Sequence, residues 1–303
     1  MNANKAVVRV HRDLKVHTSY YACPGATSTI ILVNGSLATS ASFGQTLRYL
    51  QPLFNVVLFD MPYAGQSRPY NPCPPLIGKE DEAIILLELI EHFEADRVMS
   101  FSWGGVATLL ALAQRPERIK QAVIESFSPV LNAPMHDYLA SAEDCLAALD
   151  REKVGDLINR TIGEYLPPFF KRCNFRHVST LEDHEYEQML YHVRQMKSLV
   201  ADNYMRCVSN IDVPLLFING EWDQYTSPED ARKFNGLAPQ AEFVTVRHCG
   251  HFLEMEHRTA WWEVRRAVEG FLLTRPKPKP VEATQPVAEQ PNVLPFRKVA
   301  SVG

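Results

Sequence analysis

Short runs of consecutive apolar residues, alternating with helical patterns, most constrain how this chain folds. Apolar residues that follow one another without alternation are typical of strands buried on both faces, which occur in parallel sheets covered by helices. The stretches Glu80–Phe93, Trp103–Ala113 and Thr259–Leu273 have helical spacing, as right-handed βαβ units require. The strand-length runs are Thr29–Asn34, Asn55–Asp60, Arg97–Phe101, Gln121–Glu125, Pro214–Asn219 and Glu242–Arg247. The sequence therefore predicts an α/β fold with a doubly wound, mostly parallel sheet.

One interval in this series is too long for a single crossover helix. It lies between Gln121–Glu125 and Pro214–Asn219. Within it, Val154, Ile158 and Ile162 recur at four-residue intervals, as on the apolar face of a helix. We therefore predict an all-helical cap, residues 127–213, inserted between late strands above the carboxyl edge of the sheet. The core of the sheet domain would then consist of residues 1–126 and 214–274.

The end of the chain has a different composition. Residues 275–303 read RPKPKPVEATQPVAEQPNVLPFRKVASVG, a stretch that is rich in proline and lacks apolar periodicity. Proline has no N–H group for a helix or a strand ladder. We predict a disordered or extended tail, which is either dispensable or docks to a partner.

Composition excludes several classes of protein. Of the 303 residues, 46% are hydrophobic and 22% charged, which is typical of a globular domain with a sizeable core. The chain lacks an uninterrupted apolar run of about 18 residues, so we expect no membrane span. Its first residues, MNANKAVVRVHRD, carry charges where a signal peptide needs an apolar stretch. A formal net charge of −4 disfavours a nucleic-acid partner.

The cysteines and the other potential metal ligands are scattered. No C-x-x-C pair occurs, and no His, Cys or Asp cluster has the spacing of a metal site. We therefore expect reduced thiols, a cytoplasmic location, no metal and no bound cofactor. The six cysteines are Cys23, Cys73, Cys145, Cys173, Cys207 and Cys249.

The segment Ser100-Phe101-Ser102-Trp103-Gly104-Gly105 is the strongest functional signal. It directly follows a predicted strand and directly precedes a predicted helix, which is the context of a nucleophile elbow. Ser102 stands at the tip, and the small residues Ser100 and Gly104 let the helix pack closely. The alternative is a Ser/Gly-rich loop that caps a helix. We predict that Ser102 is a catalytic nucleophile.

A serine nucleophile needs a base to accept its proton and an acid to orient that base. In this architecture the partners follow in the order Asp, then His, after the next strands. Asp223 follows Pro214–Asn219, and His251 follows Glu242–Arg247, so these two are the predicted partners. Three competitors lie close in sequence, namely Glu221, Asp230 and His248.

Acyl transfer also needs N–H donors directed at the oxygen on which negative charge develops. The amide of Trp103, directly after the nucleophile, is the first candidate. The second is the amide of Ser36, in the turn that follows Thr29–Asn34, where Gly35 permits close approach of the backbone. We expect the further turn from Asp60 to Ser67 to be structural.

Ser102, Asp223 and His251, with the turns around them, resemble the α/β-hydrolase superfamily. Longer runs resemble one narrow bacterial group over nearly the whole chain, up to about Leu273. This group contains the (R)-3-hydroxyacyl-ACP:CoA transacylases or thioesterases of polyhydroxyalkanoate supply. It also contains the synthases that join two 3-hydroxyacyl units into a rhamnolipid precursor. The runs are ILVNGSLATSASF, FNVVLFDMPYAGQS, SFSWGG, FINGEWDQYTSPEDAR and GHFLEME.

The resemblance implies a serine acyltransferase that acts on medium-chain (R)-3-hydroxyacyl thioesters. Acyl carrier protein (ACP) or CoA would carry the donor acyl group, and CoA or water would accept it, with no cofactor bound. One alternative is coupling of two 3-hydroxyacyl units into a 3-(3-hydroxyalkanoyloxy)alkanoate, and another is a general esterase. Water exclusion and cap shape decide among acceptors. A non-catalytic binding protein would not need the three ordered residues.

The cap is expected to supply the acyl pocket, which in most proteins is largely apolar. Ordinary helix packing is the alternative for each candidate. The candidates are Tyr165, Leu166, Phe169, Phe170 and Met189. The resemblance also implies an acidic carrier protein, for which Lys171, Arg172 and Arg176 form a candidate docking cluster. Residues 127–213 contain nine Lys and Arg against thirteen Asp and Glu, so a solvated face is the alternative.

Overall fold

The computed structural model describes residues 3–72, 74–198 and 205–274. Within these residues, one eight-stranded sheet has the order β1-β2-β4-β3-β5-β6-β7-β8. The six strands from β3 onward are parallel, and their ranges match the predicted strands within one residue at either end. They are β3 (Thr29–Val33), β4 (Asn55–Phe59), β5 (Arg97–Phe101), β6 (Gln121–Glu125), β7 (Leu215–Gly220) and β8 (Ala241–Val246). The predicted doubly wound α/β fold is confirmed.

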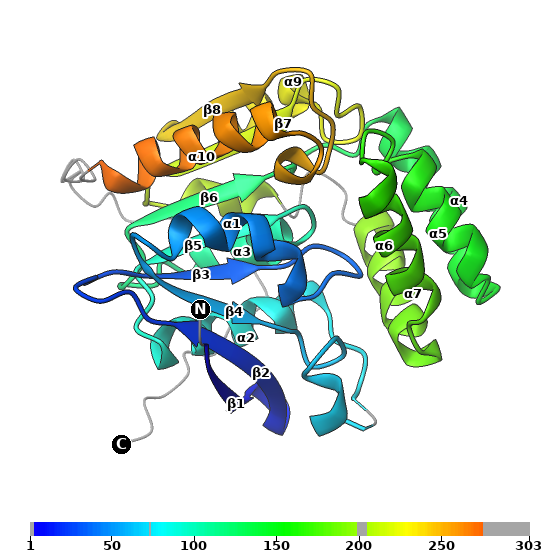
Figure 1. The fold of residues 1–303 in the computed structure, drawn as a ribbon, viewed down its shortest axis with the longest axis horizontal. Coiled ribbons are helices and arrows are strands. Elements are labelled where there is room, and N and C mark those ends of the chain that lie inside the picture. Colours follow the sequence, from blue (N-terminus) through cyan, green and yellow to red (C-terminus); the bar gives the residue numbers. More distant parts are fainter. Residues whose placement is uncertain (1–2, 73, 199–204, 275–303) are drawn as a thin grey trace, which may run out of the picture.

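The sheet begins with a hairpin that sequence analysis did not predict. Strands β1 (Asn4–Val10) and β2 (Leu14–Tyr21) pair antiparallel, and β2 pairs antiparallel with β4. Most side chains of β1 are exposed, so the strand has no buried apolar run of the kind by which the other strands were predicted. The hairpin forms the edge of the sheet in dark blue in Figure 1.

Helices cover both faces of the sheet (Figure 1). On one face, α1 (Gly44–Leu50) and α10 (Arg258–Leu273) enclose a core that includes Val56, Met99 and Val123. On the other face, α2 (Lys79–His92) and α3 (Gly104–Leu112) enclose a second core. Continuous apolar strands are what such a two-sided arrangement requires.

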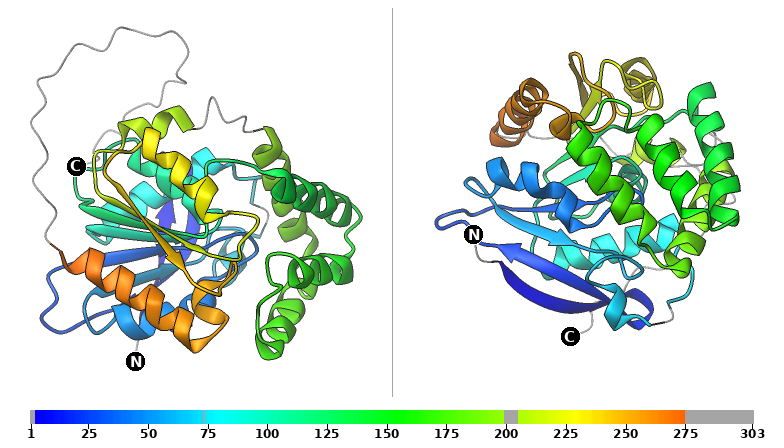
Figure 2. Two further views of the ribbon diagram at one scale, coloured as in Figure 1. Left: turned by 90° about the horizontal axis from the view of Figure 1, so that it is seen from above. Right: turned by 45° about the vertical axis from the view of Figure 1, so that its right-hand side comes forward.

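Four helices lie beyond the carboxyl ends of the parallel strands, at the right of Figure 1 and of the left view in Figure 2. They are α4 (Ala133–Ala147), α5 (Arg151–Arg160), α6 (Pro168–Ser179) and α7 (Asp183–Ser198). They come between β6 and β7, where we predicted a helical cap. The domain boundaries at residues 127, 213 and 274 stay predictions. The predicted tail, residues 275–303, lies outside the described residues.

The remaining elements are short. Helix α9 spans Pro228–Ala231. The 3-10 segments are His11–Asp13, Ser40–Phe43, Arg68–Tyr70, Met205–Asn210, Arg232–Gly236 and Leu253–Met255. None of the described helices is long and apolar enough to span a membrane.

Candidate active site

Ser102 lies at the apex of a sharp turn between β5 and α3. Its φ of 51° is in the left-handed region, which is unfavourable for a residue with a side chain and which occurs at strained functional turns. A Cβ atom on Gly104 would overlap the carbonyl oxygen of Asn34, so only glycine lets the new helix pass this close to the end of β3. Ser100 is fully buried in β5. The turn has the geometry that the predicted elbow requires.

The structure brings Ser102, His251 and Asp223 together. The Nε2 atom of His251 lies 3.0 Å from the Oγ atom of Ser102, and its Nδ1 atom lies 2.7 Å from Oδ2 of Asp223. The three residues come from the loops after β5, β8 and β7, which meet at the carboxyl edge of the sheet. Hydrogen-bond contacts therefore run from a hydroxyl through an imidazole to a carboxylate, as nucleophilic catalysis by serine requires.

Asp223 is held as a buried carboxylate. Its Oδ1 accepts hydrogen bonds from the backbone N–H groups of Tyr225 and Thr226, and its Oδ2 accepts one from the Thr226 hydroxyl at 2.6 Å. Burial acts to raise the pKa of Asp223, but the interaction with His251 and the bonds from Thr226 outweigh burial and lower the pKa. An ionised Asp223 keeps the Nδ1 atom of His251 as the donor and leaves Nε2 as the acceptor for the serine proton.

Two residues that sequence analysis missed hold the His251 loop in place. The buried carboxylate of Glu256 accepts hydrogen bonds from the backbone N–H groups of Gly250, at 2.6 Å, and Phe252, at 2.9 Å. These donors flank His251 on either side. The Ser126 hydroxyl donates to the His251 carbonyl oxygen at 2.6 Å. A signal for Glu256 was available, because the run GHFLEME contains two glutamates, Glu254 and Glu256, and a carboxylate needs a partner when it is buried.

The three competitors for these positions lie elsewhere. His248 has an exposed side chain, 73% accessible, and its Nδ1 atom lies 3.5 Å from Glu221. Glu221 also accepts the backbone N–H of His248 and so closes the turn after β8. Asp230 binds Lys233 and Asn132 at the start of α9. None of the three has a hydrogen bond to Ser102 or His251 among the described residues.

The turn after β3 lies against the elbow. A Cβ atom on Gly35 would lie 3.1 Å from the Ser102 Cβ and from the carbonyl oxygen of Phe101, so glycine permits the approach. Trp103 is the N-cap of α3, where the amide groups of a helix have no partner within the helix. Ser36 lines the same cavity as Ser102 and Trp103. The two residues that carry the predicted oxyanion donors, Trp103 and Ser36, therefore both border the cavity that contains the nucleophile.

The predicted structural role of Asp60 and Ser67 is confirmed. The Asp60 carboxylate accepts hydrogen bonds from the backbone N–H groups of Ser40 and Gln66, at 2.6 and 2.7 Å. The Ser67 hydroxyl donates to the Asp60 carbonyl oxygen. These bonds fasten the loop after β4 to the loop after β3.

A cavity of about 390 Å³ lies over Ser102, between the core and the cap. Its size is within the usual range for a binding site of a small ligand. Core residues Phe43, Phe101 and Leu253 form one wall. The opposite wall comes from the cap helices and the loop after α5, and its apolar members are Met135, Ile158, Ile162, Leu166, Phe170 and Val178. The nucleophile therefore lies between two apolar walls.

Two of the five predicted pocket residues, Leu166 and Phe170, line this cavity. Phe169 does not and is 60% exposed, because consecutive residues on a helix point in different directions. Tyr165 is 41% exposed and packs against Trp222, with ring centroids 5.1 Å apart. Met189 lines a second, smaller cavity. The prediction of Tyr165, Phe169 and Met189 as part of the wall over Ser102 is therefore corrected.

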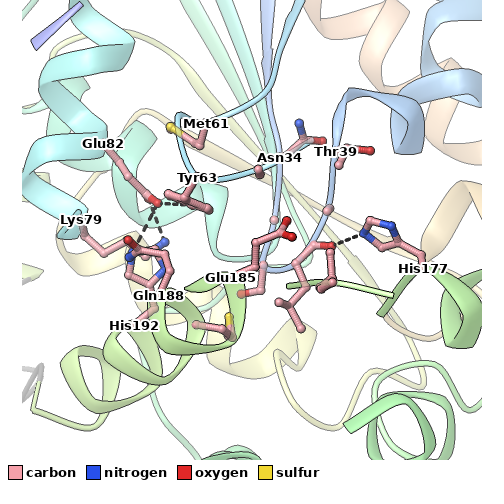
Figure 3. A pocket seen from close by; sticks show the side chains of 17 residues that line it. Asn34, Thr39, Met61, Tyr63, Lys79, Glu82, His177, Glu185, Gln188 and His192 are labelled. Carbon is pink, nitrogen blue, oxygen red and sulfur yellow. Dashed lines mark hydrogen bonds and ion pairs between the residues drawn. The ribbon is translucent and has the colours of Figure 1, made fainter. Parts of the chain in front are cut away.

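The second cavity, of about 30 Å³, lies between the turn after β3 and the cap (Figure 3). Lys79 donates to Glu82 at 2.8 Å, and the Tyr63 hydroxyl donates to Glu82 at 2.7 Å. Burial acts to raise the pKa of Glu82, but the charge of Lys79 and these bonds outweigh it and lower the pKa. His192, on cap helix α7, lies 3.5 Å from Glu82. This buried network joins the cap to α2.

A second bond joins the cap to the turn that carries Ser36. The Nε2 atom of His177, on α6, lies 2.7 Å from the carbonyl oxygen of Leu37, and a dashed line from His177 marks this contact in Figure 3. Leu37 has a φ of 53°, so this turn has a strained backbone that the contact supports. The cap therefore helps to set the shape of the turn beside the nucleophile.

The predicted docking residues lie on α6. Arg172 and Arg176 are exposed one helical turn apart, and Lys171 is partly exposed. None of the three has a carboxylate within ion-pair distance among the described residues. Across residues 3–72, 74–198 and 205–274, no group of three or more His, Cys, Asp or Glu is arranged to hold a metal ion.

Comparison with known proteins decides the family. Residues 28–258 match the family model for the alpha/beta hydrolase fold. The chain is a member of the alpha/beta hydrolase family.

Solved alpha/beta hydrolases of low sequence identity share its fold. The enzyme MGS-M2, from a deep-sea metagenome of the Medee basin, has a TM-score of 0.72 and 17% identity over 88% of this chain and 97% of its own. The enol-lactonase of Burkholderia xenovorans has a TM-score of 0.73 and 15% identity over 89% and 100%.

Two curated alpha/beta hydrolase relatives resemble this chain over almost its whole length. The (R)-3-hydroxydecanoyl-ACP:CoA transacylase of Pseudomonas aeruginosa is 54% identical, over 95% of this chain and 99% of the relative. The enzyme of the same name from Pseudomonas putida is 52% identical, over 95% and 98%. These matches confirm the narrower resemblance to the transacylase group.

Proposed function

We propose that this alpha/beta hydrolase transfers (R)-3-hydroxyacyl groups from ACP to CoA through an acyl-enzyme on Ser102. The observation that carries the proposal is the 54% identity, over almost the full length of both chains, to a transacylase with that donor and acceptor. The contacts among Ser102, His251 and Asp223 support the chemistry. They are the groups that nucleophilic acyl transfer needs.

In the first half of the reaction, Ser102 attacks the carbonyl carbon of the thioester. Its proton passes to Nε2 of His251, and the Asp223 carboxylate stabilises the imidazolium that forms. Negative charge develops on the carbonyl oxygen, where the Trp103 and Ser36 amides donate hydrogen bonds. When the tetrahedral intermediate collapses, the carbon–sulfur bond breaks and His251 returns the proton to the thiolate of the carrier.

In the second half, the CoA thiol loses its proton to His251 and attacks the acyl-enzyme. The Ser102 oxygen leaves with the proton that His251 returns, which restores the free enzyme and releases acyl-CoA. Transfer rather than hydrolysis requires that water be kept from the acyl-enzyme. The apolar walls on both sides of Ser102 are suited to keeping water out.

The acyl chain occupies the apolar cavity over Ser102. Leu166 and Phe170 form part of its cap wall. The carrier docks on α6, where Arg172 and Arg176 offer exposed positive charge to an acidic partner. This face adjoins the cavity, since Cys173 and Asn174 of the same helix line it.

Mass spectrometry of the products tests the proposal. The purified protein is given (R)-3-hydroxydecanoyl-ACP with and without CoA, and we expect 3-hydroxydecanoyl-CoA only when CoA is present. The Ser102→Ala variant, checked for folding by circular dichroism, should form neither product nor acyl-enzyme. Free acid at the same rate with or without CoA would identify a thioesterase instead, and a dimeric ester would identify a coupling enzyme.

A further inference from the structure

Two buried carboxyl groups line the core side of the cavity and have no part in the mechanism above. Glu125 ends β6 and is 3% exposed, while Glu254 follows the His251 loop and is 9% exposed. Both belong to the lining of the cavity that contains Ser102. A buried carboxyl group is costly unless its polar atoms are satisfied, so each one needs an explanation.

The two groups differ in their partners. Glu254 is satisfied, because Oε2 accepts a hydrogen bond from the Thr46 hydroxyl at 2.6 Å and Oε1 accepts one from the Tyr49 hydroxyl. Glu125 is not, because its Oε1 atom is buried and has no hydrogen-bond partner among the described residues. An unsatisfied polar atom of a residue that lines a mostly apolar cavity favours a ligand with a polar group at that point.

Ionising Glu125 and Glu254 at the same time is energetically unfavourable. Burial, and then the charge of Glu254, raise the pKa of Glu125 well above its usual value. Burial also raises the pKa of Glu254 to about 7, although the bonds from Thr46 and Tyr49 act against it. Since Glu254 accepts two bonds, it is the better site for the charge, and Glu125 holds the proton. Glu125 then offers both an O–H donor and a carbonyl acceptor.

Glu125 lies directly beside the nucleophile elbow. The backbone N–H of Ser102 donates to the carbonyl oxygen of Glu125 at 2.8 Å, and Phe101 is the register partner of Glu125 in the neighbouring strand. Register partners in adjacent strands direct their side chains to the same face of a sheet. Phe101 and Glu125 both line the cavity that contains Ser102, so Glu125 belongs to the wall beside the nucleophile.

We propose that Glu125 binds the 3-hydroxyl group of the acyl substrate and so determines specificity for 3-hydroxyacyl over plain acyl chains. The inference rests on the proposed function for its substrate class. The 3-hydroxyl is three covalent bonds from the carbon that Ser102 attacks, and the rest of the chain is apolar. A hydroxyl both donates and accepts, which matches a neutral Glu125. A site built this way rejects an analogue without the hydroxyl, because the buried carboxyl group is then left unpaired.

Calorimetric binding of two free acids, (R)-3-hydroxydecanoate and decanoate, tests this inference without requiring turnover. We expect the wild-type protein to bind the hydroxy acid at least about tenfold more tightly. Glu125→Met, which keeps the length of the side chain, should lose this preference and bind decanoate as well as or better than the wild type does. Glu125→Gln, whose amide also donates and accepts, should keep part of the preference.

Thr108→Val is the matched control. Thr108 is also buried with an unpartnered hydroxyl, but it lies within α3 and is not part of the cavity wall, so its replacement should leave the preference unchanged. Equal affinities of the two acids for the wild type would overturn the inference even if Glu125→Met failed to fold. A preference that survives in folded Glu125→Met would also overturn it and point to another polar group in the wall, such as the Ser36 hydroxyl.

Kinetics separate this inference from the proposed function. If the wild type converts both decanoyl-ACP and 3-hydroxydecanoyl-ACP to CoA thioesters equally well, the transacylase proposal stands and Glu125 has no role in specificity. If neither is converted while the acids still bind with the expected preference, the transacylase proposal fails and the assignment of Glu125 stands. A purely structural Glu125 would lower kcat/KM for both donors by the same factor in Glu125→Met, which would contradict the inference.

Discussion

Asp223 and His251 are 28 residues apart in the chain, yet Oδ2 of one lies 2.7 Å from Nδ1 of the other, and both side chains are buried. The contact exists because β7 and β8 are parallel neighbours, so the loops after them begin at the same edge of the sheet. A buried carboxylate on Nδ1 selects the tautomer in which Nε2 accepts a proton from Ser102.

Replacing Asp223 by Asn tests this relationship. The amide would favour the wrong imidazole tautomer while keeping the size of the side chain, so we expect kcat to fall by roughly 10³- to 10⁴-fold with little change in KM. Steady-state kinetics with an acyl-ACP donor measures both. Glu221→Gln, which changes an exposed acid in the same loop, should stay within about twofold of the wild type. A small loss in Asp223→Asn would argue against a proton-accepting His251.

The Glu256 carboxylate is expected to matter for stability as well as for activity. Glu256→Gln can keep only one of the two bonds to the Gly250 and Phe252 amides, so we expect a loss of about 1–3 kcal/mol in the free energy of unfolding. We also expect a lower kcat, because the His251 loop would shift. Urea unfolding and kinetics measure the two effects. Glu242→Gln, at an exposed position of β8, is the control and should change neither.

The buried His192 predicts a pH-dependent stability. Burial, and then the charge of Lys79, lower the pKa of His192 to about 4 from a usual value of 6.5, against the opposing effect of Glu82. In the unfolded chain the imidazole takes up a proton near pH 6.5, whereas in the folded protein it does so only near pH 4. The contribution of this group is therefore complete above pH 6.5 and is lost as the pH falls towards 4.

His192→Gln removes this titration. The difference in unfolding free energy between the wild type and this variant, measured in urea, should shrink by about 1–2 kcal/mol between pH 7.5 and pH 5. Comparing the two proteins cancels the titration of all other groups that the substitution leaves unchanged. A difference that is constant over this range would show that His192 titrates normally in the folded protein.

Carrier docking on α6 predicts a change in KM. Reversing the charges in Arg172→Glu/Arg176→Glu should raise KM for the acyl-ACP donor by roughly tenfold or more at low salt, with kcat little changed, because exposed charges act on association. The effect should shrink at high ionic strength. Arg266→Glu, at an exposed position of α10, makes the same kind of charge reversal at one site away from the cap and should have no effect. An unchanged KM in the double variant would contradict carrier docking on α6.

Sequence analysis predicted most of the fold because its signals are local. Strands buried on both faces are recognisable as apolar runs, and the elbow is recognisable because a strained turn between a strand and a helix needs small residues around Ser102. The β1–β2 hairpin was missed although β1 contains the short apolar run Ala6-Val7-Val8, because its side chains are mostly exposed at the edge of the sheet and local sequence does not show where a strand lies in a sheet. Phe169 and Phe170 show the same limit, because two identical neighbours on a helix cannot be told apart without knowing which side faces the cavity.

The order of Ser102, Asp223 and His251 along the chain, each placed after a strand, was enough to predict which residues meet, since the carboxyl ends of parallel strands converge on one edge. Only the folded protein could place Glu125 and Glu254 in the wall of one cavity or set Glu256 against the His251 loop. Those positions depend on the packing of α1 and of the loop after β8 against the sheet. Burial and interatomic distances decide that Glu256 holds the His251 loop and that the pKa of Glu125 is raised. Local sequence encodes neither quantity.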